Sequence, residues 1–187
     1  LGTQMKATGE VMSIGRTMEE SLLKAMRSLE TGVCHIYHKK FDDWTNDRLL
    51  EYIAEPTDDR LYAIAQLIRG GVDLVLIYNR TKIDMFFLEK FKNIVEFERV
   101  VEAAPMNIEV LREAKRMGFS DKFIGQLWGV SQHDMYLLRE KNGIFPVYKM
   151  IDTCASEFSS YVPYFYSTYE DENESVVSDK EKIVVLG

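Results

Sequence analysis

Residues 82–103, KIDMFFLEKFKNIVEFERVVEA, carry the longest helical pattern in the chain. Their apolar side chains recur at helical spacing, which predicts an amphipathic helix from Lys82 to Ala103 with one buried face. Thr81 stands directly before the stretch, where its side chain can cap the first turn. An aromatic-rich stripe of this kind is more often core than a cofactor site. The stripe comprises Ile83, Phe86, Phe87, Phe91, Ile94 and Val95.

Three shorter helices are predicted on the C-terminal side of this stretch. Each begins after a Ser or Asn whose side chain can accept a first-turn N–H, and each ends near a glycine that tolerates positive φ. The last two lie in FSDKFIGQLWGVSQHDMYLLREKNGI, residues 119–144, and would form a compact hairpin. The predicted caps and ends are Asn107 with Met117 and Gly118, Ser120 with Gly129, and Ser131 with Asn142-Gly143.

The hairpin at residues 120–139 also looks like a DNA-binding helix-turn-helix, which is the alternative interpretation. Its second helix region offers only Arg139 and Lys141 as cations, and Asp134 would face the phosphates. The formal net charge of the whole chain is −7, which disfavours broad contact with a phosphate backbone. We therefore favour a structural hairpin and expect no nucleic-acid partner.

Two helices are predicted between residues 46 and 71. The first spans 46–54 and ends before Pro56. Thr57 can cap the second, and Gly70-Gly71 would end it. Residues 72–78, VDLVLIY, are ambiguous, because their composition favours a strand that would lack a partner among helices. We expect a buried helical turn there, followed by a loop. The apolar face of the second helix comprises Leu61, Ile64, Ala65 and Ile68.

Residues 17–20, TMEE, are typical of a capping box at the start of a helix. Thr17 can accept the backbone N–H of the third helical position, and Glu20 can reach back to the amide of Thr17. Gly32 is the predicted end of this helix. The preceding residues 9–16, GEVMSIGR, predict a short strand or an extended segment.

The histidines and cysteines do not predict a metal site. His35 and His38 could share a metal, but no carboxylate–histidine framework surrounds them in the sequence, so we expect a solvated loop over residues 33–44. Cys34 and Cys154 match no metal spacing and are expected to be reduced thiols. The sequence has no nucleophile elbow, phosphate-binding glycine loop or paired-carboxylate motif. We therefore expect no catalysis by this chain alone.

Hydrophobic residues make up 46% of the chain and charged residues 28%, a balance that can supply a core. No apolar run is long enough to span a bilayer, so we expect no membrane partner. Aromatic side chains crowd residues 161–169, and acidic ones follow at 170–174. Residues 179–187, DKEKIVVLG, read as the first strand of a parallel sheet. That lone strand, and Leu1 in place of Met, predict a piece of a longer protein.

Five segments, in order, resemble the large subunit of carbamoyl-phosphate synthase. Residues 3–30, which contain GEVMSIGRT, are similar to the end of its first ATP-grasp half. Residues 79–98 resemble a helix of its oligomerisation domain, and residues 118–140 resemble the hairpin that follows. Residues 146–174, which contain DTCASEF and STYE, and residues 179–187 look like the passage into the second half.

The resemblance implies a mainly α fold with three parts. Residues 1–30 would be the C-terminal end of the carboxyphosphate half, residues 31–174 a multi-helix oligomerisation domain, and residues 175–187 the first strand of the carbamoyl-phosphate half. The two ends would be short α/β flanks from the neighbouring ATP-grasp halves. The segment itself would then have a structural role and assist assembly into oligomers.

The resemblance also implies the activity of the longer enzyme. That enzyme makes carbamoyl phosphate from bicarbonate, glutamine-derived ammonia and two ATP molecules, for arginine and pyrimidine synthesis in the cytoplasm. Its ATP, with Mg or Mn, binds outside this segment, so no cofactor is expected here. The implied partners are the rest of the large subunit, a glutaminase small subunit and further copies. Glu10 matches a glutamate near the internal carbamate passage, and an ion pair with Arg16 remains an open alternative.

Overall fold

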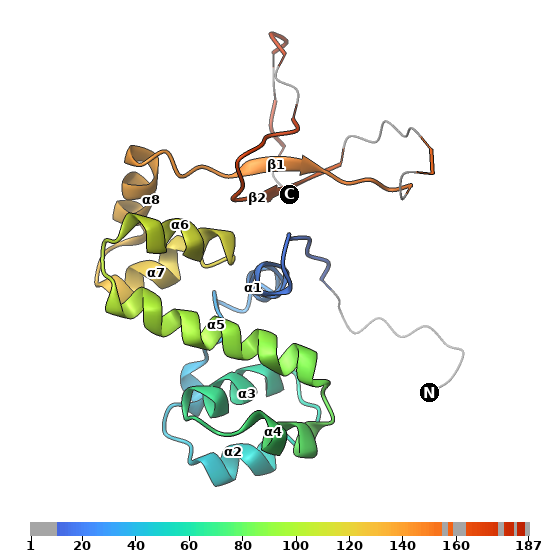
Figure 1. Ribbon diagram of the computed structural model, residues 1–187, viewed down its shortest axis with the longest axis vertical. Helices are drawn as coiled ribbons and strands as arrows, with labels where there is room; N and C mark the ends of the chain where they lie inside the picture. The colour runs from blue at the N-terminus through green and yellow to red at the C-terminus, as the bar shows by residue number, and fades with distance from the viewer. Residues whose placement is uncertain (1–10, 155–156, 159–163, 176–177, 182, 186–187) are drawn as a thin grey trace.

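The computed structural model describes residues 11–154, 157–158, 164–175, 178–181 and 183–185. These residues form eight α-helices, one short 3-10 helix and a two-stranded antiparallel sheet (Figure 1), so the expected mainly α fold is confirmed. In chain order the elements are α1 Met18–Ser28, η1 Lys39–Phe41, α2 Asn46–Tyr52, α3 Arg60–Arg69, α4 Leu74–Thr81, α5 Met85–Ala103, α6 Ile108–Arg116, α7 Asp121–Trp128, α8 Gln132–Lys141, β1 Val147–Met150 and β2 Phe165–Thr168.

Helix α5 is the centre of the fold. It packs against α1, α3, α4, α6 and α7. In Figure 1 it separates a lower group of helices, α2 to α4, from an upper group, α6 to α8. Phe91, Ile94 and Val95 of the predicted stripe are buried, whereas Phe86 and Phe87 are exposed. The predicted stripe is therefore core along most of the helix and surface at its beginning.

The start of α5 differs from the prediction. Thr81 does not cap it but is the last residue of α4, and its hydroxyl donates to the carbonyl of Ile77 at 2.8 Å. Lys82 has a φ of 57°, a left-handed conformation through which a right-handed helix does not continue. The chain becomes helical again only at Met85, where the Asp84 side chain accepts a first-turn N–H. The helix therefore begins at Met85, three residues later than predicted.

Helix α3 also begins later than predicted. Its N-cap is Asp59 rather than Thr57, and the Asp59 carboxylate makes no hydrogen bond to the helix. Instead it accepts hydrogen bonds from Thr57, Lys40 and Tyr52. Asp59 does not cap the first turn of α3 because these three donors occupy its carboxylate oxygens. Helix α2 ends at Tyr52, slightly short of the expected limit.

Residues 74–78 of the segment 72–78 are helical, as expected, but most of the segment is not buried. It forms most of α4, whose first turn is capped by the side chain of Asp73 at the amide of Val75. Ile77 is the one residue of this helix that is fully buried. The expected loop after a single turn is wrong, because the helix continues to Thr81.

The predicted caps of the C-terminal helices are confirmed. The side chains of Asn107, Ser120 and Ser131 each accept a first-turn backbone N–H of α6, α7 and α8 respectively. Gly118 and Gly129 follow α6 and α7 with φ angles of 89° and 69°, a conformation that favours glycine. Helices α7 and α8 pack against each other as a hairpin. Local sequence was sufficient here, because each end is fixed by a single side chain or glycine.

Helix α1 begins as the capping box predicts, with one shift. Thr17 accepts from the amide of Glu20 at 3.1 Å, but the Glu20 carboxylate accepts from the amide of Arg16 rather than that of Thr17, at 2.7 Å. The helix ends at Ser28, before the predicted Gly32, and Glu30 takes a positive φ of 53°. Residues 11–15 form no strand, since no strand in the described part of the chain pairs with them.

The sheet of β1 and β2 was not predicted. The strands pair antiparallel, with Val147 opposite Thr168 and Met150 opposite Phe165. On its other edge β1 is bonded to the acidic turn, since the amide of Glu174 donates to the carbonyl of Tyr148 at 2.8 Å. Figure 1 shows this hairpin at the top of the molecule, beyond α1 and α6. In residues 183–185 no strand is formed and the side chains are exposed.

Candidate interaction surface

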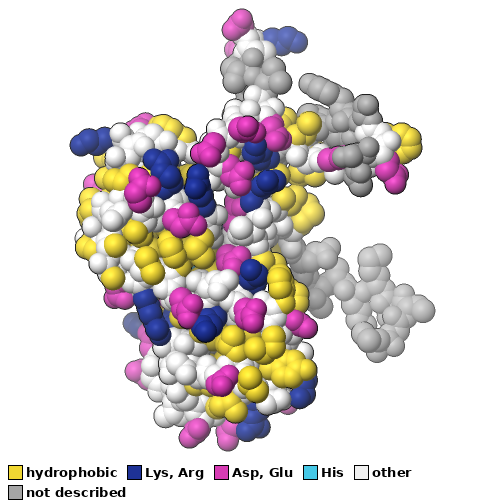
Figure 2. All heavy atoms as spheres, in the orientation of Figure 1, with side chains coloured by type: hydrophobic (Ala, Val, Ile, Leu, Met, Phe, Trp, Pro, Cys, Tyr) yellow, Lys and Arg dark blue, Asp and Glu magenta, His cyan; other side chains and the backbone are white. Residues whose placement is uncertain are grey.

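Five large hydrophobic side chains on α4 and the beginning of α5 are exposed to solvent. Each keeps between 38% and 53% of its surface accessible. Figure 2 shows hydrophobic side chains gathered over these two helices, at the lower right of the view. Exposed apolar groups of this kind mark sites of protein contact when they cluster. We call this set the α4–α5 surface: Val75, Leu76, Tyr78, Phe86 and Phe87.

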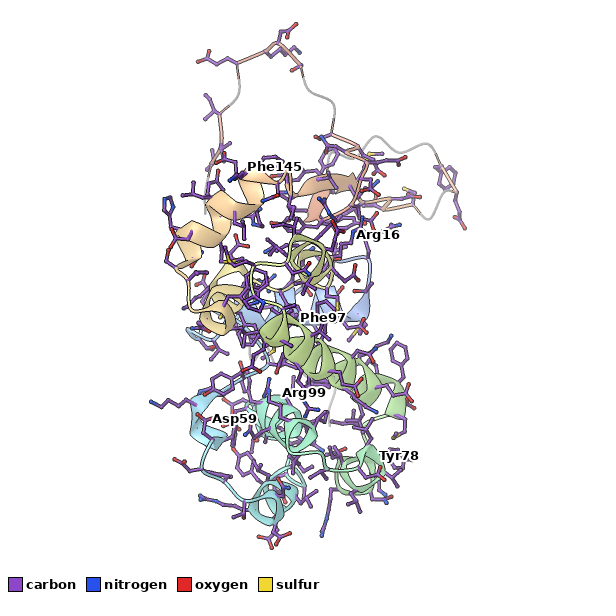
Figure 3. The ribbon with its side chains drawn as sticks, turned by 60° about the vertical axis from the view of Figure 1, so that its left-hand side comes forward. Arg16, Asp59, Tyr78, Phe97, Arg99 and Phe145 are labelled. Carbon is purple, nitrogen blue, oxygen red and sulfur yellow. The ribbon has the colours of Figure 1, made fainter. Side chains whose placement is uncertain are left out.

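The geometry of α4 explains why it presents apolar side chains outward. Ile77 points into the core with no exposed area, next to the partly buried Leu74. Val75 and Tyr78 are three residues apart and therefore share the opposite face, and Figure 3 shows Tyr78 on α4 at the outer end of the molecule. A helix that is apolar on both faces is normally buried. Within the described structure, nothing covers the outer face of α4.

Cations border the aromatic side chains of this surface. The rings of Phe86 and Phe87 pack edge to face, with centroids 5.3 Å apart. The ammonium of Lys90 lies 5.4 Å from the centre of the Phe86 ring, and that of Lys82 lies 5.4 Å from the Tyr78 ring. An apolar centre with a charged rim is the usual composition of a protein–protein interface.

A groove of about 650 Å³ continues from Phe86 along α5, between α1 and α6. Its apolar lining includes Phe97, labelled on α5 in Figure 3, and Met117. Glu19 lies in the groove and accepts a hydrogen bond from Asn93 at 2.8 Å. Burial opposes ionisation of Glu19, but this hydrogen bond and the nearby Lys90 outweigh it and lower its pKa.

A buried polar cluster joins the loop around His35 to α3 and α5. Nε2 of His35 lies 2.9 Å from Oε1 of Glu98. Arg69 donates to both Glu98 oxygens, at 2.8 Å and 2.6 Å, and also to the carbonyl of Ile36 at 3.0 Å. The His35 ring stacks on Phe123 of α7, with centroids 3.7 Å apart. Three separate parts of the chain therefore meet at one carboxylate, and α7 packs against the cluster through Phe123.

This arrangement corrects the expectation of a solvated loop with no carboxylate partner. His35 is 1% exposed, and its partner, Glu98, lies far away in the sequence. His38 is half-buried and turns its Nδ1 to the amide of Lys40. The two histidines therefore bind different partners, Glu98 and the Lys40 amide, and do not face a common site. Among the described residues, no group of three or more His, Cys, Asp or Glu side chains could hold a metal ion.

The protonation states of this cluster follow from burial and pairing. Burial alone would raise the pKa of Glu98, but hydrogen bonds from Arg69 and His35 outweigh it and hold the pKa below its usual value. Burial lowers the pKa of His35, and its hydrogen bond to Glu98 only partly opposes this. Since Arg69 already neutralises Glu98, the cluster is stable with a neutral imidazole.

A second buried cluster closes the α7–α8 hairpin onto α6. Arg139 forms a bidentate pair with Asp121, with closest contact 2.7 Å, and donates to the carbonyl of Ile144. Lys115 donates to Asp121 and to the carbonyl of Phe119, both at 2.8 Å. Burial lowers the pKa of Lys115 to about 8. The Asp121 carboxylate is therefore shared by two cations in the interior.

This cluster removes the main support for a DNA-binding helix-turn-helix. Arg139, one of the two cations of the proposed reading region, is 7% exposed and is held inside by Asp121. Asp134 is at the exposed beginning of α8, where it is bonded to Ser131. A reading helix needs cations and donors that can reach the groove, and nothing in this arrangement favours that role.

Glu10, to which the family resemblance assigned a functional role, lies outside the described residues. The α4–α5 surface could not be identified from the sequence, because apolar residues at helical spacing predict core and interface equally well. One signal could have indicated it. Residues 74–78 are all apolar, more than one buried face of a short helix needs.

The helical part of the chain matches a known protein family. No helix among the residues described here has the length and apolar character needed to cross a membrane. Residues 10–143, more than two thirds of the chain, match a family model described as "Carbamoyl-phosphate synthetase large chain, oligomerisation domain". The matched region contains the α4–α5 surface, the charged side chains of both buried clusters and the eight described helices.

Proposed function

This chain belongs to the family of carbamoyl-phosphate synthetase large-chain oligomerisation domains, and we propose that it associates with a second copy of itself through the α4–α5 surface. The observation that carries the proposal is the outward apolar face of α4 together with Phe86 and Phe87. The family description names oligomerisation. A self-complementary contact of this kind buries the same side chains from both copies.

The expected strength of the contact follows from the side chains involved. Burying one such side chain completely contributes roughly 1.5–3 kcal/mol. About half of each is already buried, so the ten side chains of two copies contribute on the order of 10 kcal/mol. Association costs about 4–15 kcal/mol before any contact is counted. We therefore expect a reversible association that depends on protein concentration.

Light scattering over a concentration series tests the proposal. Leu76→Asp places a charge in the middle of the surface and should shift the chain to monomer. Leu137→Asp is the matched control, because Leu137 is 45% exposed on α8 and lies outside the surface. Equal masses for both variants at every concentration would contradict the α4–α5 assignment.

The rest of the large subunit is the second proposed partner. The β1–β2 hairpin exposes Phe145, Tyr148, Met150, Tyr164 and Phe165 near the top of the molecule, where Figure 3 labels Phe145. We place this surface towards the carbamoyl-phosphate half, which would follow residue 174. The proposed limits stay at residues 1–30, 31–174 and 175–187. Binding of a separately produced second half, weakened by Tyr148→Asp, would test this contact.

The longer enzyme is proposed to be a cytoplasmic, glutamine-hydrolysing ligase that makes carbamoyl phosphate. Its ATP, with Mg or Mn, would bind outside this chain, and a glutaminase small subunit would supply ammonia. Two features support a non-catalytic role for the chain itself. The ionisable side chains of its two buried clusters are paired with each other, and the outward face of α4 is apolar. The isolated chain should show no ATP-dependent synthesis, whereas the intact enzyme should.

Glu10 is proposed to contact the internal carbamate passage in the intact enzyme. A carboxylate at such a passage can accept hydrogen bonds from polar species that move through it. Glu10→Ala should slow overall synthesis while sparing each ATP-dependent half-reaction. Unchanged overall turnover would leave only a structural role for this residue.

A further inference from the structure

The groove beside α5 has an acidic rim. Its charged lining residues are three glutamates and one lysine. Lys90 pairs with Glu19 at 3.4 Å, which leaves Glu96 and Glu113 exposed at the edge of the groove. Glu113 has no ion-pair partner among the described residues, and Glu96 has only the exposed Lys92, at 3.5 Å. We call Glu96 and Glu113 the acidic rim.

The neighbouring end of α4 is basic. Arg80 lies in the last turn of this helix and Lys82 is its C-cap, and both side chains are exposed. Arg80 has no ion-pair partner in the described part of the chain, whereas Lys82 lies over the Tyr78 ring. We call Arg80 and Lys82 the basic end. Apolar surface joins it to the groove, since Phe86 belongs to the α4–α5 surface and also lines the groove.

The basic end and the acidic rim lie on opposite sides of Phe86. In Figure 1, α4 lies below the beginning of α5, and α6, which carries Glu113, lies above the rest of that helix. Glu96 follows Phe86 by ten residues on α5, which is about 15 Å at a rise of 1.5 Å per residue. A surface with opposite charges at its two ends is complementary to a second copy of itself turned through a two-fold axis.

The exposed face of α4 has the spacing of a helix that docks in a groove. Val75 and Tyr78 are three residues apart, and Leu76 and Arg80 are four apart, so each pair shares one side of the helix. Helices with apolar anchors at this spacing lie in apolar grooves of their partners. The apolar lining of the groove includes Phe97, Val100 and Met117.

We propose that α4 of a second copy lies in this groove, so that the basic end of each copy meets the acidic rim of the other. A two-fold axis near the rings of Phe86 and Phe87 makes both contacts at once. The apolar side chains supply most of the affinity, and the charges set the orientation and the choice of partner. This inference rests on the proposed self-association through the α4–α5 surface and specifies its geometry.

Charge reversal in the 187-residue chain tests this geometry. Arg80→Glu/Lys82→Glu reverses the basic end, and Glu96→Lys/Glu113→Lys reverses the acidic rim. Light scattering should give each variant alone a dissociation constant at least about tenfold higher than that of the original chain. An equimolar mixture of the two variants should regain the original association, because a mixed pair has opposite charges at both contacts. Circular dichroism should show the same helix content in both variants, since all four positions are exposed.

Two further variants control for net charge. Lys122→Glu/Lys141→Glu and Glu102→Lys/Glu140→Lys change the net charge by the same amounts, at exposed positions outside the groove and the α4–α5 surface. The measurements are made at about 0.15 M salt, where charges more than about 8 Å apart are largely screened. Neither control variant, alone or mixed with the other, should differ from the original chain.

The outcomes separate this inference from the proposed self-association. If the original chain is a monomer at every concentration, both are wrong. If the original chain associates and Leu76→Asp does not, the α4–α5 surface is supported. In that case, charge-reversed variants that associate as tightly as the original chain, or a mixture no tighter than the variants alone, would overturn the docking of α4 in the groove and leave the α4–α5 surface intact.

Discussion

Nε2 of His35 and Oε1 of Glu98 lie 2.9 Å apart, and this hydrogen bond fastens an irregular loop to the central helix. Arg69 completes the contact from α3. Glu98 and His35 are 8% and 1% exposed. The three side chains therefore depend on one another, because a charge left alone in such a site is poorly solvated.

Glu98→Ala should destabilise the fold strongly. The substitution leaves Arg69 and His35 without their acceptor, and breaking a buried ion pair costs about 3–5 kcal/mol. Urea unfolding followed by circular dichroism measures the change. Glu96→Ala, at an exposed position of the same helix, is the control and should have little effect. Similar stabilities for the two variants would contradict the role assigned to the cluster.

The free energy of unfolding should fall as the pH drops below about 6.5, the ordinary pKa of histidine. Burial lowers the pKa of His35 in the folded chain, so the unfolded chain takes up this proton first. The lowered pKa of Glu98 adds a further loss below about pH 4.5.

Urea unfolding at about pH 5.5 and about pH 7.5 measures the first effect. In His35→Gln the difference between these two pH values should shrink, while in His133→Gln it should persist, because His133 is exposed. If the stability difference between the two pH values is unchanged in His35→Gln, groups other than His35 cause it.

Asp121→Asn should loosen the α7–α8 hairpin. The substitution removes the charge shared by Arg139 and Lys115, both of which are buried, and a cost of about 3–5 kcal/mol is expected. Loss of amide protection in α7 and α8 would report it. Glu140→Gln, on the exposed side of α8, should leave the amide protection unchanged. Equal protection in the two variants would contradict the stabilising role assigned to Asp121.

The chain should not shift a DNA fragment in a gel, even at low salt where non-specific binding is strongest. Arg139 is held by Asp121, and the overall charge repels phosphates. A clear shift at low salt that weakens as salt is added would contradict this expectation.

Local signals predicted much of this fold, and non-local contacts account for the rest. Thr17, Asn107, Ser120 and Ser131 cap helices as their sequence positions suggest, because a cap acts within a few residues. The prediction for Thr57 was wrong because its hydroxyl donates to Asp59, which also accepts from Lys40 and Tyr52, and the helix begins only after Asp59. The β1–β2 pairing joins strands separated by fourteen residues, which no local pattern encodes.

The candidate sites were harder to predict than the fold. His35 finds Glu98 only when the chain folds, so its sequence neighbourhood suggested a solvated loop. The α4–α5 surface uses the same residue types as the core, and only exposure distinguishes the two. Glu10 could be proposed only from the family resemblance.

Amide hydrogen exchange at low and high protein concentration tests the central claim most directly. If copies of the chain associate through the α4–α5 surface, exchange across α4 and the first turn of α5 should slow at high concentration. Exchange in α7 and α8, away from the surface, should stay the same. Exchange that does not depend on concentration anywhere, or that slows only outside α4 and the start of α5, would contradict the account.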